Sequence, residues 1–290
     1  MPVAVAGAVE LAYETHGDPG DPPLLLIAGL GQQLTMWPMP FVHTLAVAGY
    51  RVIRFDNRDV GLSTHLGGKL NLSEIAAAMR GGQTPEAPYT LGDMAADAAG
   101  LLDHLGIERT HVVGISMGGA IAQELAIHHG LRVRSMACVM ATTGAADVGQ
   151  PNATGNRALF RAPPHERAGA IASMIESAAL LASPGHFDER SARHHATMAY
   201  DRAFDPEGVG RQLGAIWVSG DRTVRLKEVV APALVIHGDA DPLIDVSGGR
   251  AIAVALPAAN YVEIHGMAHD LPTAFWPEIL GPLLQHLAAA

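Results

Sequence analysis

A pattern of the type Gly-x-Ser-x-Gly at residues 114–118 constrains the fold of this chain more than any other feature. It follows a β-branched run at 110–115 and precedes residues 120–128, which can continue as a helix. A serine raised out of a sheet needs a sharp strand-to-helix turn, and Gly114 and Gly118 stand where a Cβ would crowd that turn. Because the five letters alone also arise by chance, it is this context that makes Ser116 a candidate nucleophile.

Six short apolar runs predict the strands of a mostly parallel sheet. Most are nearly continuous rather than alternating, as expected for strands that are buried on both faces. Helical patterns lie between them; the clearest, at 91–105, has one apolar face, and Thr90 with Asp93 resembles a capping box at its start. Strands that alternate with helices predict a three-layer α/β fold with helices on both faces of the sheet. The expected strands are 24–28, 51–55, 111–115, 134–140, 233–237 and 261–264.

The alternation stops between residues 143 and 227, a stretch called here the inserted segment. Prolines and loops punctuate it, and 168–181, 191–200 and 208–218 can each form a helix. We expect the inserted segment to be a helical lid, laid over a core that is built from residues 1–142 and 228–290.

Composition and charge exclude several classes of protein. The chain has 290 residues, 49% of them hydrophobic, which is enough for a large buried core. Its 19 Lys and Arg against 29 Asp and Glu give a net charge of −10 with no basic run, so no nucleic-acid partner is expected. Since no signal peptide and no run near the ~20 apolar residues of a membrane helix is seen, we expect a cytoplasmic protein. The single cysteine, Cys138, lies in an apolar run and is expected to be a buried, inert thiol.

Candidates for an activating base and acid follow the last two expected strands. A serine hydroxyl needs a base to remove its proton, and that base works best beside a carboxylate. The turns at 238–244 and 265–270 follow these two strands directly, at the edge where α/β sheets place their ligand crevice. The order serine, acid, histidine along the chain is that of an α/β-hydrolase triad. The candidate acids are Asp239, Asp241 and Asp245, with Asp147 as a remote alternative, and the candidate bases are His237, His265 and His269.

Over essentially its whole length, the chain resembles an α/β-hydrolase-fold esterase. The matching stretches are 26–30, 55–63, the turn at 114–118, the acid turn at 238–244 and the histidine loop at 265–270. Within that superfamily it is most similar to the aclacinomycin methylesterases and related small hydrolases, in which the form D-N-R-D-x-G-x-S, here at 56–63, is usual. The resemblance implies that Asp241, in G-x-x-D-P, is the acid and that His269, in G-x-x-H, is the base.

The other charged side chains near these turns are expected to be structural. Neighbouring acids can cap the turn and the helix that begins near residue 246, and histidines at the ends of buried strands are usually hydrogen-bonded. The family parallel assigns the charged residues of 56–59 to tying down the loop beside the site. These side chains are Asp239, Asp245, His237, His265, Asp56, Arg58 and Asp59.

The resemblance also implies an oxyanion hole made of two backbone N–H groups. One expected donor is Met117, directly after the nucleophile; the other is Leu30, in a loop where Ala28 replaces the family's common histidine. Methionine and alanine in the inserted segment predict an apolar, adaptable substrate pocket. The residues expected to line it, each of which also fits an ordinary core, are Trp37, Met140, Trp217 and Leu243.

We therefore expect a serine hydrolase, without metal or cofactor, that cleaves small apolar carboxylic esters through an acyl-enzyme. A perhydrolase or a C–C bond hydrolase with the same triad stays open, as does a ligand receptor that turns over slowly. Dehalogenases and epoxide hydrolases are disfavoured because their nucleophile is an aspartate rather than Ser116. The pairs at 128–129 and 194–195 predict no metal site, since adjacent histidines on a helix point apart.

Overall fold

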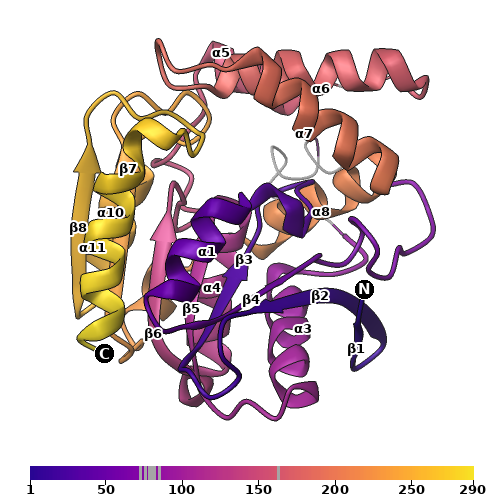
Figure 1. Cartoon of the computed structure of the whole chain (residues 1–290). Coiled ribbons are helices and arrows are strands. Elements are labelled where there is room, and N and C mark those ends of the chain that lie inside the picture. Colours follow the sequence, from indigo (N-terminus) through magenta and orange to yellow (C-terminus); the bar gives the residue numbers. More distant parts are fainter. Residues whose placement is uncertain (72–73, 75–76, 78–82, 84–85, 162–163) are drawn as a thin grey trace.

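All six predicted apolar runs form strands of one sheet, in the computed structural model that describes residues 1–71, 74, 77, 83, 86–161 and 164–290. The sheet has the order β1-β2-β4-β3-β5-β6-β7-β8, and neighbouring strands from β4 to β8 run parallel (Figure 1). The carboxyl ends of these strands therefore meet along one edge, where an α/β sheet places its ligands. The strands from the predicted runs are β3 (Pro23–Ile27), β4 (Arg51–Phe55), β5 (Thr110–Ile115), β6 (Val133–Val139), β7 (Ala233–Gly238) and β8 (Ala259–Ile264).

Two further strands at the N-terminus were not predicted. β1 (Val3–Ala6) and β2 (Val9–His16) pair antiparallel with each other, and β2 also pairs antiparallel with β4. Their alternation is short: Val9 and Leu11 are buried and Glu10 between them is exposed. Such a pattern is typical of strands near a sheet edge with one solvated face, and it is weaker than the continuous runs of the central strands.

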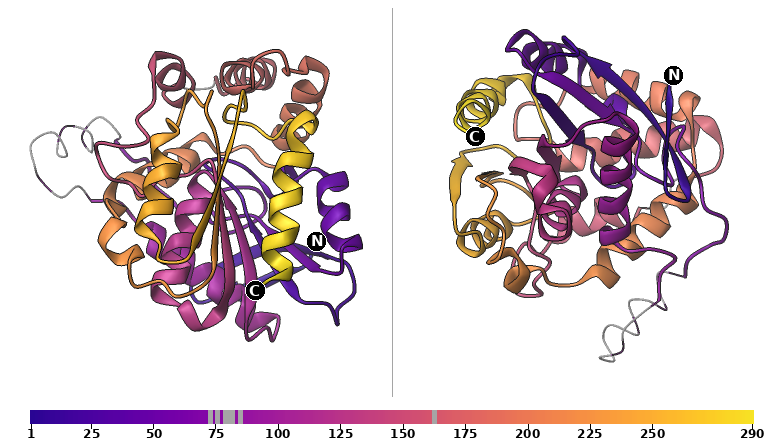
Figure 2. Two further views of the ribbon diagram at one scale, coloured as in Figure 1. Left: turned by 90° about the vertical axis from the view of Figure 1, so that its left-hand side faces the viewer. Right: turned by 90° about the horizontal axis from the view of Figure 1, so that it is seen from below.

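Helices cover both faces of the sheet, so the predicted three-layer fold is confirmed. α3 (Leu91–His104), α4 (Met117–His128) and α10 (Ser247–Ala255) pack on one face, and α1 (Met39–Val47) and α11 (Trp276–Ala288) on the other (Figure 2). The predicted capping box is present: Thr90 N–H donates to Asp93 Oδ2 at 2.7 Å, and Asp93 N–H donates to Thr90 Oγ1 at 3.2 Å. None of the helices in the described ranges has the length and apolar character that a membrane span requires.

The inserted segment connects β6 to β7 through helices. α5, α6 and α7 lie above the carboxyl ends of the parallel strands, and α8 lies lower, where it packs on α3 (Figure 1). α6 and α7 share a small apolar cluster of their own around Ile171, Ile175 and Ala196. The division into core and lid at residues 143 and 227 stays a prediction. The described helices of the segment are α5 (Ala153–Leu159), α6 (Arg167–Leu181), α7 (Glu189–Arg202), α8 (Pro206–Ser219) and α9 (Thr223–Leu226).

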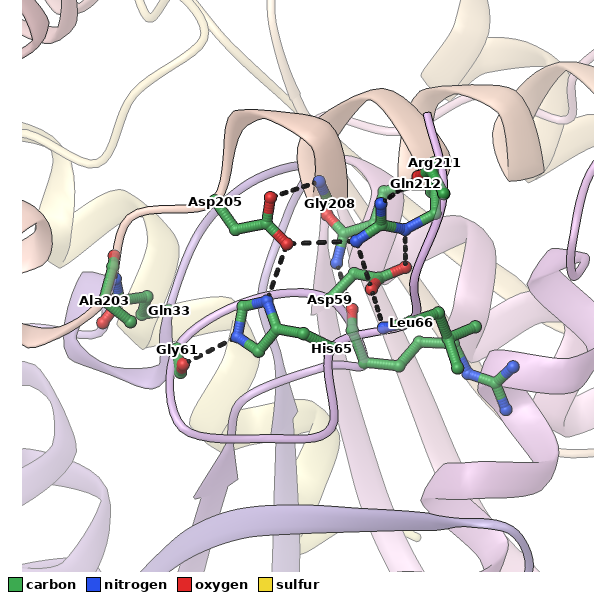
Figure 3. Close-up of polar contacts among 12 residues, drawn as sticks. Gln33, Asp59, Gly61, His65, Leu66, Ala203, Asp205, Gly208, Arg211 and Gln212 are labelled. Atoms are coloured by element: carbon green, nitrogen blue, oxygen red, sulfur yellow. Dashed lines mark hydrogen bonds and ion pairs between the residues drawn. The ribbon is translucent and has the colours of Figure 1, made fainter. Parts of the chain in front are cut away.

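A buried ion-pair network ties α8 to the loop after β4 (Figure 3). Arg211 of α8 donates to the two oxygens of Asp59 at 3.0 and 2.8 Å and to Asp205 Oδ2 at 3.0 Å. Asp59 also accepts from the hydroxyl of Tyr89 and from the N–H of Leu66, both at 2.7 Å. Because each buried charge has hydrogen-bonded partners of opposite charge or polarity, the network holds α8 firmly to the core.

The same network gathers Asp59, His65 and Asp205, the one set of three possible metal ligands found among the described residues. The guanidinium of Arg211 donates to both carboxylates and so already supplies the positive charge between them that a metal ion would provide. His65 completes the set with Nδ1 2.8 Å from Asp205 Oδ2 and Nε2 3.0 Å from the carbonyl oxygen of Gly61. Both partners of the ring are acceptors, so the set fits an imidazolium and a guanidinium better than a metal ion.

We expect His65 to make stability depend on pH. Burial alone would lower its pKa, but the hydrogen bonds to Gly61 and Asp205 and the charges of Asp205 and Asp59 raise the pKa above 6.5. A raised histidine pKa contributes stability that is complete below pH 6.5 and is lost as pH rises through the folded-state pKa. From pH 6 to pH 9, the free energy of unfolding of wild type, measured with urea, should fall by up to about 1 kcal/mol more than that of His65→Gln. The loss is small because the His65–Asp205 pair is partly exposed. If wild type instead gained stability relative to His65→Gln as the pH rises, the prediction would be wrong.

The first turn of α4 lies against β3 at a distance that only glycine allows. A Cβ on Gly118 would lie 2.1 Å from the carbonyl oxygen of Ile27, and one on Gly114 would lie 2.1 Å from the carbonyl oxygen of Gly118. Neither neighbour is the end of a flexible side chain, so the backbone itself would have to move. The close approach fixes where α4 begins relative to two strands.

Gly118→Ala is therefore expected to destabilise the protein by about 1–3 kcal/mol or more, because α4 must move away from β3. Gly130→Ala is the matched control, since a Cβ on Gly130 meets nothing within 4 Å. It should change the free energy of unfolding by less than about 0.5 kcal/mol. Urea unfolding of both variants measures the difference, and equal midpoints would show that the close approach does not constrain the fold.

Candidate active site

Ser116 sits at the sharp turn between β5 and α4. Its backbone has φ 55° and ψ −120°, a left-handed conformation that costs about 1–3 kcal/mol and persists only where the surroundings impose it. The two glycines of the motif allow the turn to close here without a steric clash, as the sequence predicted. Ser116 is partly exposed although β5 is buried throughout, so the turn presents this side chain at the carboxyl edge of the sheet.

His269 and Asp241 join Ser116 in a continuous chain of contacts. His269 Nδ1 lies 2.7 Å from Asp241 Oδ2, and His269 Nε2 lies 3.0 Å from Ser116 Oγ. With Asp241 accepting from Nδ1–H, Nε2 carries the lone pair and faces the serine hydroxyl. This is the geometry in which a histidine can take the proton of a serine.

Asp241 is fixed independently of the histidine. Its Oδ1 accepts from the N–H groups of Leu243 and Ile244 at 2.8 and 2.9 Å, so the acid caps its own turn. Burial favours the neutral acid, but the charge of His269 and hydrogen bonds from His237 and His269 overcome it and hold the pKa of Asp241 well below its ordinary value. The carboxylate is therefore ionised and oriented before any substrate arrives.

The competing acids of the sequence lie elsewhere. Asp239 is bonded to His265 Nδ1 and to the N–H of Gly266, both at 2.7 Å. Asp245 accepts from the N–H of Ser247 at 3.0 Å, but the N-cap of α10 is Val246, so Asp245 lies one residue before the capping position expected for it. Asp147 is exposed on the loop after β6. Among the described candidates, it is Asp241 that contacts His269.

The two other candidate histidines differ from each other. His237 is fully buried, and its Nε2 donates to the carbonyl oxygen of Ile244 at 2.8 Å, as expected of a structural histidine. His265 is hydrogen-bonded to Asp239, but its side chain is 98% exposed rather than at the end of a buried strand. The expectation failed in this respect because β8 is the edge strand, so its end is open to solvent.

The charged residues at 56–59 have structural partners, as expected. Asp56 accepts from the N–H groups of Leu34 and Leu62 at 2.7 and 2.9 Å and pairs with Arg202 at 2.7 Å. Arg58 makes two hydrogen bonds of 2.6 Å to Asp97 of α3. These contacts join the loop after β4 to α3, α7 and the loop after β3.

The loop with Leu30 lies directly beside the nucleophile. A Cβ on Gly29 would come within 3.3 Å of Ser116 Cβ. The neighbouring N–H groups are occupied: that of Gly29 donates to Gln32 Oε1 at 3.0 Å, and that of Gly31 donates to Gln212 Oε1 at 2.8 Å. Gln212 belongs to α8, is fully buried, and also donates to the carbonyl oxygen of Arg58 at 2.8 Å. The inserted segment thus holds this loop.

Met117 is the first residue of α4, so its N–H is one of the groups that a helix leaves unbonded at its N-terminus. It lies in the chain directly after Ser116. A developing oxyanion at the serine would meet this N–H and the positive end of the helix dipole.

The histidine loop is held by residues that the sequence did not single out. The N–H of Ala268 donates to Ser183 Oγ at 2.9 Å, and that of His269 donates to the carbonyl oxygen of Leu181 at 3.1 Å. Asp270 accepts from Ser183 Oγ at 2.5 Å and from its N–H at 3.0 Å. The sequence could have indicated Asp270, because a carboxylate directly follows the candidate histidine. It gave no such indication for Ser183, which is an ordinary serine after a helix.

The four residues expected to line a substrate pocket fall into two groups. Trp37 and Met140 are each 1% exposed and belong to the apolar cluster on the α1 and α11 face. Trp217 and Leu243 are partly exposed, and Trp217 packs against Phe160 with ring centroids 6.0 Å apart. Their contact with a substrate stays a prediction.

Comparisons with known proteins show the family of the chain and its fold. Residues 22–272 match the family model described as the alpha/beta hydrolase fold. Rhodomycin D methylesterase of Streptomyces peucetius is 31% identical over 97% of this chain and 96% of its own length. The enol-lactonase of Burkholderia xenovorans LB400 has a TM-score of 0.71 at 25% identity, covering 99% of this chain and 98% of its own.

The fold is also shared with a meta-cleavage product hydrolase of Pseudomonas fluorescens IP01, at a TM-score of 0.79 and 19% identity, over 100% of this chain and 98% of its own. The mostly parallel sheet agrees with the family model, which matches most of the chain. The chain belongs to the α/β-hydrolase fold family.

Proposed function

We propose that the protein is a serine hydrolase that cleaves carboxylic esters of small molecules. The observation that carries the proposal is the unbroken chain of contacts from Asp241 through His269 to Ser116, with distances of 2.7 and 3.0 Å. The methylesterase relative, which is similar over nearly the whole chain, supports an ester as the substrate class. The acid of this chain is ionised, and its base faces the nucleophile.

The proposed reaction proceeds in two halves. His269 Nε2 takes the proton of Ser116 while Oγ attacks the ester carbonyl, and Asp241 stabilises the imidazolium that forms. The N–H groups of Met117 and Leu30 stabilise the oxyanion. His269 then gives the proton to the departing alcohol, which leaves an acyl group on Ser116. Water that is deprotonated by His269 attacks this acyl group, and collapse of the second oxyanion releases the acid and restores the serine.

We also infer that residues 143–227 act as a lid that selects the substrate. α5, α6 and α7 lie over the carboxyl ends of the strands (Figure 1), and the partly exposed Ser116 follows β5 directly at that edge. The partly exposed Trp217 and Leu243 favour an apolar acyl or alcohol group there, and the buried Trp37 and Met140 would form the floor.

Ser116→Ala is expected to lower kcat on a short p-nitrophenyl ester by on the order of 10⁴–10⁶, because no acyl-enzyme can form. A fluorophosphonate probe should label the wild type at Ser116 and should not label the variant. The melting temperature should fall little, since the change removes one oxygen at a partly exposed position. Near-normal turnover by the variant would remove the proposal.

Asp241→Asn should lower kcat by on the order of 10³–10⁴, because an amide cannot stabilise the imidazolium of His269 and favours the wrong tautomer. Asp239→Asn is the matched control: this acid lies in the same turn but bonds to the exposed His265. Steady-state kinetics on the same ester should show the control within about threefold of wild type. If kcat fell equally in the two variants, the assignment of Asp241 as the catalytic acid would be wrong.

A substrate panel separates ester hydrolysis from other reactions of the same triad. Methyl and short p-nitrophenyl esters should give steady multiple turnover, and lactones, diketones and peracid formation from acetate and peroxide should be slower. A single burst with no steady phase would instead indicate a slow-turnover ligand receptor.

A further inference from the structure

Three consecutive residues of the histidine loop bond to one short stretch of the inserted segment. Ala268 and His269 donate their N–H groups to Ser183 Oγ and to the carbonyl oxygen of Leu181, at 2.9 and 3.1 Å. Asp270 accepts from the Oγ and the N–H of Ser183, at 2.5 and 3.0 Å. Ser183 follows α6, more than 80 residues earlier in the chain than His269.

The start of the histidine loop is fixed by the acid turn, because the N–H of Gly266 donates to Asp239 Oδ1 at 2.7 Å and the N–H of Ala240 donates to the carbonyl oxygen of Met267 at 3.1 Å. The N–H groups of Ala268 and His269 and the carboxylate of Asp270 bond instead to the inserted segment. Residues 265–272, between β8 and the short helical turn at 273–275, form no strand and no helix. His269 must nevertheless keep two contacts at once, 2.7 Å to Asp241 and 3.0 Å to Ser116. Displacement of a reacting group by about 1 Å can cost about 100-fold in rate. Contacts from outside the loop therefore decide whether the base stays in place.

Ser183 is well suited to this task. It is 1% exposed, and its hydroxyl both donates to Asp270 and accepts from Ala268, so its hydrogen-bonding capacity is directed at the two residues that flank the histidine. Burial raises the pKa of Asp270, whereas the hydrogen bonds from Ser183 and the charge of His269 act in the opposite direction. The net effect is a raised pKa, so the hydrogen bonds from Ser183 limit the effect of burial without cancelling it.

We propose that Ser183 is a positioning residue for the general base, so that the α6–α7 connection is part of the catalytic machinery as well as of the lid. This inference rests on the proposed function, because it assigns a role relative to His269. A purely structural hydrogen bond would change the stability of the segment. A positioning bond changes the rate at each folded active site.

The test compares Ser183→Ala with wild type per active site, counted by complete fluorophosphonate labelling. We expect kcat on a short p-nitrophenyl ester to fall about 10-fold with KM within about twofold, because the change acts on the base and not on substrate binding. The rate constant of fluorophosphonate labelling, which also needs His269 to activate Ser116, should fall by a similar factor. Ser183→Thr, which keeps the hydroxyl, should restore both rates to within about threefold.

A matched control is available on α6. Ser173 is also buried and accepts a hydrogen bond from Arg161 Nε at 3.0 Å, but it lies away from the histidine loop. Ser173→Ala should therefore leave kcat and the labelling rate unchanged per active site. If Ser183→Ala fails to fold, Ser183→Cys, which weakens both hydrogen bonds of the side chain, should give an intermediate loss of about threefold.

The outcomes separate this inference from the proposed function. If wild type hydrolyses esters and Ser183→Ala keeps both rates within twofold, or if Ser173→Ala loses as much, the positioning role is wrong and the hydrolase proposal stands. If wild type labels but turns over no ester, the labelling rates alone still decide the role of Ser183. A wild type that neither labels nor turns over overturns both.

Discussion

The contact between the first turn of α4 and β3 is the constraint on which the site depends. Gly118 brings α4 against the carbonyl oxygen of Ile27, at the end of β3, and β3 runs directly into the loop that carries Leu30. The same contact therefore places the strained Ser116 and the proposed oxyanion loop side by side. Neither Ser116 nor the loop can shift alone, because β5, which leads into Ser116, is paired in parallel with β3, which leads into the loop, and with β6 on its other side.

The other two members of the proposed triad, Asp241 and His269, reach Ser116 because β6, β7 and β8 follow β5 in order across the sheet. The turn with Asp241 is rigid, since the acid bonds to two of its own backbone N–H groups. The loop with His269 is held at its start by the acid turn, through Asp239 and Ala240, and around the histidine by Ser183 and Leu181.

Sequence predicted the parts of the molecule whose pattern is local. The central strands were visible because they are buried on both faces, and the two glycines around Ser116 were visible because a tight turn requires them. The partners Ser183 and Gln212 were not visible, because a buried hydrogen bond across 85 or 181 residues leaves no trace in the spacing of a sequence. Each looks like an ordinary polar residue of a helical region until the fold places it.

These long-range bonds change how the inserted segment should be understood. Its α6–α7 connection bonds to both neighbours of His269, and Gln212 of α8 bonds to Gly31, next to the proposed oxyanion donor. Arg211 fixes α8 to the core through a buried double hydrogen bond to Asp59. The helices that would select the substrate are thus the ones that hold the base and the oxyanion loop. A change of specificity by substitutions in this segment would therefore alter catalytic geometry at the same time, unless it spared these few buried polar side chains.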